Sequence, residues 1–301
     1  MGALRALWAI FGTLLICAQC HSPLSDPFQP GNYSVAQLSL SARTIGVDGL
    51  HCEVWAPREL GEYPTVAFAS AFGMITPSRV YSKLFERLAS HGVVVAGFSK
   101  INNPNYPILA AEFGHAVNWM EANLTGTLSS HGLAAVADVQ HRLVVAGHSA
   151  GNHIVTRMLE DGCGLAKAFI MVDPVDGVDP FGMIKQFVIH PPAKVNFTIP
   201  ALHIETGNDP VPAFRHAKKY PACAPANMSN NRFYDAWRGP IWQINATRYG
   251  HLDVCDNGIF RLVSSPICRE EKGVDLTIYR DTVADLMHCF IRGILDGENA
   301  H

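Results

Sequence analysis

The residues best suited to chemistry are a serine between two glycines and a histidine much later in the chain. The segment Gly147-His148-Ser149-Ala150-Gly151 matches the pattern G-x-S-x-G. An apolar run at residues 142–146 (RLVVA) leads into it, and residues 152–159 follow with helical spacing. A strand, a sharp turn and a helix in that order place a serine hydroxyl at the edge of a sheet. We therefore expect Ser149 to be a nucleophile that attacks an ester carbonyl.

A serine hydroxyl needs a base to take its proton, and the base needs an acid to orient it. With this kind of turn the order along the chain is serine, acid, histidine. His251 follows the last strand signal and is the expected base, whereas His288 lies within an apolar helical segment and fits a packed residue. Asp173 and Asp209 each follow an apolar run, and the pattern alone does not choose between them as the acid. The nearby Asp176 fits a turn residue or a solvated charge.

Negative charge that develops on the carbonyl oxygen needs two backbone N–H donors. One is expected from Ala150, directly after the nucleophile. The other is expected from Met74, in a loop that follows the strand-forming run at residues 65–70. We expect the substrate pocket to be lined by residues of these two loops, namely Phe72, Gly73, Ile75 and His148.

Apolar runs alternate with amphipathic segments from residue 65 to the C-terminus. The pattern predicts strands at residues 65–70, 93–98, 142–146, 168–172, 201–204 and 241–244, and helices at residues 80–90, 108–124, 152–159 and 275–295. Residues 33–55 alternate in the manner of antiparallel edge strands. Continuous apolar strands separated by helices indicate a mostly parallel sheet with helices on both faces. The sequence therefore predicts an α/β-hydrolase fold, in a single domain over residues 21–301.

The start of the chain predicts export. Arg5 precedes an apolar run at residues 6–18, which is too short to cross a bilayer comfortably, so residues 1–20 are typical of a signal peptide. Six cysteines follow this segment, and an even number favours disulfides without indicating their pairing: Cys52, Cys163, Cys223, Cys255, Cys268 and Cys289. Five N-x-[ST] sequons favour glycosylation, at Asn32, Asn123, Asn196, Asn227 and Asn245. We expect a secreted glycoprotein with no stable membrane span.

Composition and spacing argue against other classes of function. The net charge is −3 and no basic run occurs, so nucleic-acid binding has no electrostatic basis. No C-x-x-C or H-E-x-x-H spacing indicates a metal site, and serine hydrolysis requires no cofactor. The expected partner is a small lipophilic ester. The sequence indicates neither the oligomeric state nor the identity of that ester.

Several motifs, in one order between residues 50 and 265, resemble chlorophyllases, a branch of the α/β hydrolases. The similar stretches are Phe72-Gly73, residues 81–92 (YSKLFERLASHG), the GHSAG segment, Asp173-Pro174-Val175-Asp176-Gly177, Cys223-Ala224-Pro225 and Tyr249-Gly250-His251-Leu252-Asp253. The chain departs from the family's usual pattern at two of these: Ser149-Ala150-Gly151-Asn152 replaces Ser-Arg-Gly-Gly, and Phe72-Gly73 replaces His-Gly.

The resemblance implies an acid and a substrate class. Chlorophyllases use the aspartate of the D-P-V stretch, which is Asp173 here, and Asp209 remains the alternative. The implied substrate is a hydrophobic carboxylic ester such as the phytyl ester of chlorophyll. Two other functions stay open: a lipid esterase of the platelet-activating-factor acetylhydrolase type, and a non-catalytic binding protein built on the same fold.

Overall fold

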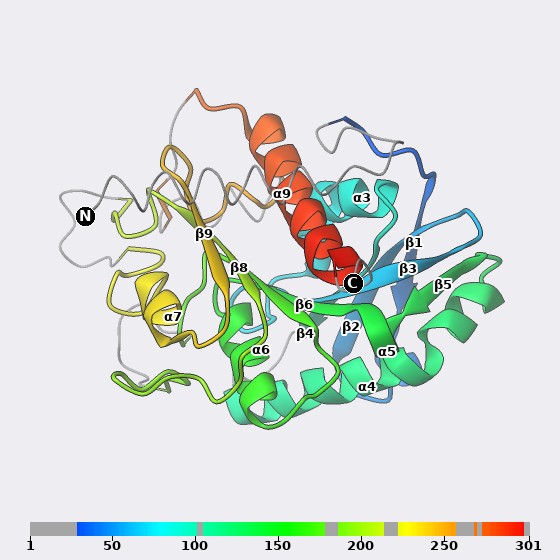
Figure 1. Ribbon diagram of the computed structural model, residues 1–301, viewed down its shortest axis with the longest axis horizontal. Coiled ribbons are helices and arrows are strands. Elements are labelled where there is room, and N and C mark those ends of the chain that lie inside the picture. Colours follow the sequence, from blue (N-terminus) through cyan, green and yellow to red (C-terminus); the bar gives the residue numbers. More distant parts are fainter. Residues whose placement is uncertain are drawn as a thin grey trace.

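The computed structural model describes residues 29–100, 105–177, 186–213, 222–256, 268–269 and 273–297 (Figure 1). The predicted signal peptide, residues 1–20, lies outside the described residues.

Nine strands form one sheet within the described part of the chain. They are β1 (Val35–Leu40), β2 (Leu50–Pro57), β3 (Gly61–Ala69), β4 (Val94–Lys100), β5 (Ala135–Asp138), β6 (Leu143–His148), β7 (Ala168–Val172), β8 (Ala201–Thr206) and β9 (Ile241–Ala246). Their order is β1-β2-β4-β3-β6-β7-β8-β9, and β5 also pairs with β3. The pairs β1–β2 and β2–β4 are antiparallel and the other pairs are parallel. The predicted α/β-hydrolase architecture, with antiparallel strands at one edge, is confirmed.

Helices cover both faces of this sheet. Helices α3 (Ser82–Ser90) and α9 (Leu276–Gly297) lie together on one face, and α4 (Tyr106–Ser130) and α6 (Gly151–Glu160) on the other (Figure 1). Apolar side chains of α3 and α9, such as Phe85 and Met287, are fully buried against one side of the strands. Phe113 of α4 and Ile154 of α6 are buried against the other. Burial of each such side chain contributes about 1.5–3 kcal/mol to folding.

The predicted strands and long helices are all present, with moved ends. Helix α4 continues past the expected Leu124 as far as Ser130, because Leu128 repeats the buried face one turn later. The sequence reasoning missed β5 and the short helical segments α2 (Ala42–Ile45), η1 (Ser78–Tyr81), α5 (Val139–Arg142) and α7 (Asn231–Ala236). These pieces have four to six residues, too few for a clear periodic signal.

The parallel register brings several strand ends to one edge of the sheet. Ala69 pairs with Gly147, and His148 pairs with Val172, so β3, β6 and β7 end side by side. Val172 in turn pairs with Ile204 of β8. The loops that follow these strands carry the residues predicted to do chemistry, and the fold therefore gathers them at this carboxyl edge.

One disulfide joins Cys223 to Cys268. Cys52 is a buried thiol, and Cys163 is a half-buried one. Among the helices that the structure describes, none combines the length and the apolar character needed to cross a bilayer.

Candidate active site

Ser149 sits on a strained turn between β6 and α6. Its φ of +57° lies in the left-handed region, which a serine seldom adopts. The flanking glycines allow the chain to pass close to its neighbours. A Cβ at Gly151 would lie 2.2 Å from the Ala69 carbonyl oxygen, and one at Gly147 would lie 2.8 Å from the Asn152 nitrogen. The spacing G-x-S-x-G therefore follows from contact between the end of β3 and the start of α6.

Asn152 ties this turn to the next strand. Its fully buried side chain donates hydrogen bonds to the carbonyl oxygens of Ser149 and Val172, both at 3.1 Å. The Ser149 N–H also donates to the Val172 carbonyl, at 3.0 Å. Asn152 occupies a position where the resembled family commonly has glycine, and the sequence alone did not indicate a role for it. Its side chain fixes the turn against β7.

His251 lies within hydrogen-bonding distance of the Ser149 hydroxyl. The distance from His251 Nε2 to Ser149 Oγ is 2.8 Å, and the two residues are 2% and 6% exposed. The loop that carries His251 is held on both sides. The Gly250 N–H donates to Asp253 Oδ2 at 2.8 Å, and Arg280 of α9 donates to the Asp253 carbonyl at 3.0 Å. The imidazole is therefore held in position to accept the serine proton.

The carboxylate that contacts His251 belongs to Asp209. The distance from His251 Nδ1 to Asp209 Oδ1 is 3.3 Å. Thr206 Oγ1 donates to the same oxygen at 2.6 Å, and Asn230 Nδ2 donates to the other at 3.2 Å. Burial opposes ionisation of Asp209, but the charge and hydrogen bond of His251, together with hydrogen bonds from Thr206 and Asp173, outweigh it and lower the pKa of Asp209. Sequence reasoning missed both Thr206 and Asn230.

Asp173, the acid that the resemblance implied, makes a different contact. Its Oδ1 accepts a hydrogen bond of 2.6 Å from the Thr206 N–H, while its Oδ2 is buried with no hydrogen-bond partner among the described residues. Its φ is +42°, and it is fully buried. Burial and then the neighbouring Asp209 carboxylate raise the pKa of Asp173 well above its usual range. The two carboxyl groups thus flank Thr206, and the one bonded to the imidazole is Asp209.

The expected oxyanion donors differ in their present contacts. Ala150 caps the N-terminus of α6, and its N–H has no acceptor among the described residues. The Met74 N–H, by contrast, donates to the Ser70 carbonyl at 3.0 Å. Phe72, Gly73 and Met74 have φ values of +53°, +60° and +69°, so this turn is strained at Phe72 and Met74, while Gly73 adopts its conformation freely.

The residues expected to line the pocket fall into two groups. Ile75 is 38% exposed and Phe72 is half-buried, so both can meet a ligand from outside. Gly73 is buried beside Phe72. His148 is fully buried. Its imidazole is bonded to Tyr81 and to the His251 carbonyl, so it lies beneath the turn rather than on a pocket wall.

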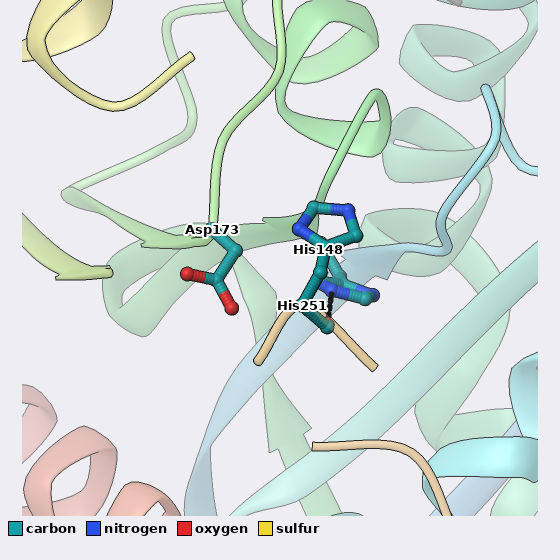
Figure 2. A group of neighbouring side chains, drawn as sticks. All are labelled: His148, Asp173 and His251. Atoms are coloured by element: carbon teal, nitrogen blue, oxygen red, sulfur yellow. Dashed lines mark hydrogen bonds between the residues drawn. The ribbon is translucent and has the colours of Figure 1, made fainter. Parts of the chain in front are cut away.

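The side chains of His148, Asp173 and His251 lie close together, with one ligand atom of each within 4.8 Å of the others (Figure 2). The two imidazole rings have centroids 4.9 Å apart. Such a group could in principle bind a metal ion. However, each of the four imidazole nitrogens already has a hydrogen-bond partner: Tyr81, the His251 carbonyl, Asp209 and Ser149. We interpret the group as part of a hydrogen-bonded network.

Asp176 is buried rather than solvated. Its carboxylate accepts hydrogen bonds from His153 at 2.8 Å and from Arg232 at 2.7 Å. It also accepts the N–H groups of Val188 and Ile189. The local sequence predicted a turn residue or a solvated charge, because the residues that bond to Asp176 lie in distant segments and cannot be recognised from the neighbouring positions. In the structure Asp176 joins α6, α7 and the chain that precedes β8.

Comparisons with known proteins identify related sequences. Residues 24–301 match the chlorophyllase family. "Chlorophyllase type 0" of Chenopodium album is 26% identical over 259 residues, which cover 81% of this chain and 70% of that protein. "Chlorophyllase-2" of Arabidopsis thaliana is 26% identical over 269 residues, which cover 82% of this chain and 78% of that protein.

Proposed function

Because this chain belongs to the chlorophyllase family of ester hydrolases, we propose that it cleaves a carboxylic ester through an acyl-enzyme formed on Ser149. The observation that carries the proposal is the 2.8 Å distance between His251 Nε2 and Ser149 Oγ, with Ser149 on a strained turn at the carboxyl edge of the sheet. His251 accepts the proton as Oγ bonds to the carbonyl carbon. It then returns the proton to the leaving alcohol.

Hydrolysis of the acyl-enzyme reverses these roles. A water molecule gives a proton to His251 and attacks the acyl carbon, and the proton then returns to Ser149 as the acid leaves. The Ala150 N–H, at the N-terminus of α6, stabilises the oxyanion in both steps. The second donor comes from the Phe72–Met74 turn. The expected donor, Met74, must release the Ser70 carbonyl to fill this role.

The acid that orients His251 is proposed to be Asp209. It accepts from Nδ1–H, so the lone pair of the imidazole stays on Nε2, facing Ser149. Three donors converge on its two oxygens, and its pKa is lowered, so it carries negative charge near neutral pH. Asp173 supports it indirectly by accepting the Thr206 N–H.

The substrate is proposed to be a lipophilic ester. The names of the relatives point to chlorophyll, whose phytyl ester is the first substrate to test. Ile75 is 38% exposed beside the half-buried Phe72, so an apolar acyl or alcohol chain has apolar surface to contact next to the strained turn.

The protein is proposed to be secreted and glycosylated. The apolar leader at residues 6–18 and the disulfide between Cys223 and Cys268 support export. All five sequon asparagines are exposed: Asn32, Asn123, Asn196, Asn227 and Asn245. Expression with the native leader, followed by N-terminal sequencing and enzymatic removal of N-glycans, tests both points. Retention inside the cell without a glycan would reject them.

The decisive experiment combines labelling with substrate release. A fluorophosphonate probe should label the wild type but not Ser149→Ala, and the labelled peptide should contain Ser149. Release of phytol from chlorophyll is then compared with cleavage of short-chain nitrophenyl esters and of platelet-activating-factor-like phospholipids. An unlabelled, folded wild type that is inactive on all three would mean a non-catalytic protein. Preference for the phospholipid would move the assignment to a lipid esterase.

A further inference from the structure

The side chain of His148 lies at the centre of a buried chain of hydrogen bonds. His148 directly precedes Ser149, and its ring is fully buried. Its Nδ1 lies 2.8 Å from the Tyr81 hydroxyl, and its Nε2 lies 2.9 Å from the His251 carbonyl oxygen. Tyr81 is also fully buried, and its oxygen accepts the Ala71 N–H at 3.2 Å. Three loops therefore meet at two side chains.

The direction of each hydrogen bond follows from the chemistry of the end groups. A carbonyl oxygen only accepts, so His148 Nε2 carries a proton and donates a hydrogen bond to the main-chain carbonyl of His251. A neutral imidazole then has its lone pair on Nδ1, so the Tyr81 hydroxyl donates to it. The Ala71 N–H donates to the same hydroxyl oxygen. Burial, and then the nearby His251, lower the pKa of His148 to about 3, so the ring is neutral at neutral pH.

We propose that Tyr81 and His148 are positioning residues that hold the serine turn, the His251 backbone and the Ala71 end of the Phe72–Met74 turn in one fixed arrangement. The inference rests on the proposed ester hydrolysis. Neither side chain contacts the reacting atoms. They hold the His251 main chain in the position that puts Nε2 within hydrogen-bonding distance of Ser149 Oγ. They also fix the start of the strained Phe72–Met74 turn. Displacements of about 1 Å in such arrangements lower turnover by about a hundredfold.

Packing and hydrogen bonding by Tyr81 can be separated. Its ring contacts Phe68, at a centroid distance of 4.9 Å, and Phe85, at 5.7 Å. Tyr81→Phe keeps these ring contacts and removes only the hydroxyl. The Ala71 N–H then loses its acceptor and His148 Nδ1 loses its donor. The Cys255 thiol also interacts with the Tyr81 hydroxyl, and this contact is lost in the same variant.

The test compares the kinetics of three variants. Tyr81→Phe should lower kcat by about 10- to 100-fold and change KM by less than about threefold, since the substrate contacts remain. His148→Gln can still donate to the His251 carbonyl and accept from Tyr81, so it should keep more activity than His148→Phe, which can do neither. Tyr63→Phe is the matched control. Tyr63 is also buried, but its hydroxyl donates to the carbonyl of Glu59, just before the start of β3 and at the opposite end of the strand from Ala69.

Two results would overturn the proposal. One is a folded Tyr81→Phe variant whose kcat stays within twofold of wild type. The other is a nitrogen-15 NMR spectrum of the wild type in which His148 carries its proton on Nδ1. The NMR experiment does not depend on turnover or on any variant. If the wild type is inactive and Ser149 is not labelled, the proposed function fails, and the spectrum still decides whether the hydrogen-bonded chain exists.

Discussion

Replacement of Asp209 by asparagine should reduce turnover far more than the same replacement of Asp173. In Asp209→Asn an amide NH₂ takes the place of one carboxylate oxygen. If NH₂ replaces Oδ2, it faces the NH₂ group of Asn230, and two donors then meet without an acceptor between them. Asn230 cannot rotate its amide without loss, because its oxygen contacts His203 Nε2 at 3.2 Å. A buried donor without an acceptor costs about 1–3 kcal/mol.

The other orientation damages catalysis directly. If NH₂ replaces Oδ1, it donates to His251 Nδ1 and forces the imidazole proton onto Nε2. The nitrogen that faces Ser149 then has no lone pair to accept the serine proton. The negative charge that stabilises the imidazolium is lost in both orientations. The corresponding change in a serine protease lowers kcat by about 10⁴-fold, so we expect a loss of about 10³- to 10⁴-fold, or about 4–5.5 kcal/mol of transition-state stabilisation.

Asp173→Asn is the matched control. Burial and the Asp209 charge favour the neutral acid at this position, and an amide resembles a neutral carboxyl in shape. The amide oxygen can still accept the Thr206 N–H. We expect kcat/KM to fall by less than about tenfold. Both variants are assayed on the best ester from the substrate panel, with circular dichroism to check folding. A folded Asp173→Asn that loses a thousandfold, beside an active Asp209→Asn, would refute the assignment of the acid.

Two further predictions concern the framework. Gly151→Ala should abolish labelling of Ser149 by fluorophosphonate and destabilise the fold, because its Cβ would lie 2.2 Å from the Ala69 carbonyl oxygen; an active, stable variant would contradict this. Burial, and then the neighbouring His91, lower the pKa of His288 to about 3, so the unfolded chain binds this proton first as the pH falls below about 6.5, and stability is lost towards acid. His288→Phe can keep the stacking on His91, at a centroid distance of 4.7 Å. In urea denaturation, the loss of unfolding free energy between pH 6.5 and 4.5 should be about 2 kcal/mol smaller in this variant than in the wild type, and equal losses would refute this.

The sequence was sufficient for the longer strands and helices and for the contact between Ser149 and His251. Strands such as β7 and β8 are continuous apolar runs, so their ends are visible in the sequence, and the parallel order brings those ends to one edge. The second glycine of the G-x-S-x-G spacing is required because a Cβ at Gly151 would clash with the Ala69 carbonyl oxygen. Local patterns of this kind do not depend on distant side chains.

The choice of acid could not be predicted from the sequence, because it depends on the direction in which the side chains of Asp173 and Asp209 point. Asp173 and Asp209 both follow strands, but the left-handed backbone at Asp173 directs its carboxyl to the Thr206 N–H. The position of His148 was missed for the same reason. Its place in the motif suggested the pocket, whereas its contacts come from Tyr81, far away in the sequence.

Backbone strain gives an independent reason to treat these loops as one unit. Within the described part of the chain, the non-glycine residues with positive φ are Phe72, Met74, Ser149, Asp173 and Asn230. Each lies in the turn after β3, in the serine turn, or around the Asp209 carboxylate. Such conformations cost about 1–3 kcal/mol each and persist only where the surroundings fix them. Backbone hydrogen bonds at Met74, Ser149, Asp173 and Asn230 supply that constraint. Strain confined to the loops that meet at Ser149 is expected of a preorganised site, because a site selected only for stability would relax it.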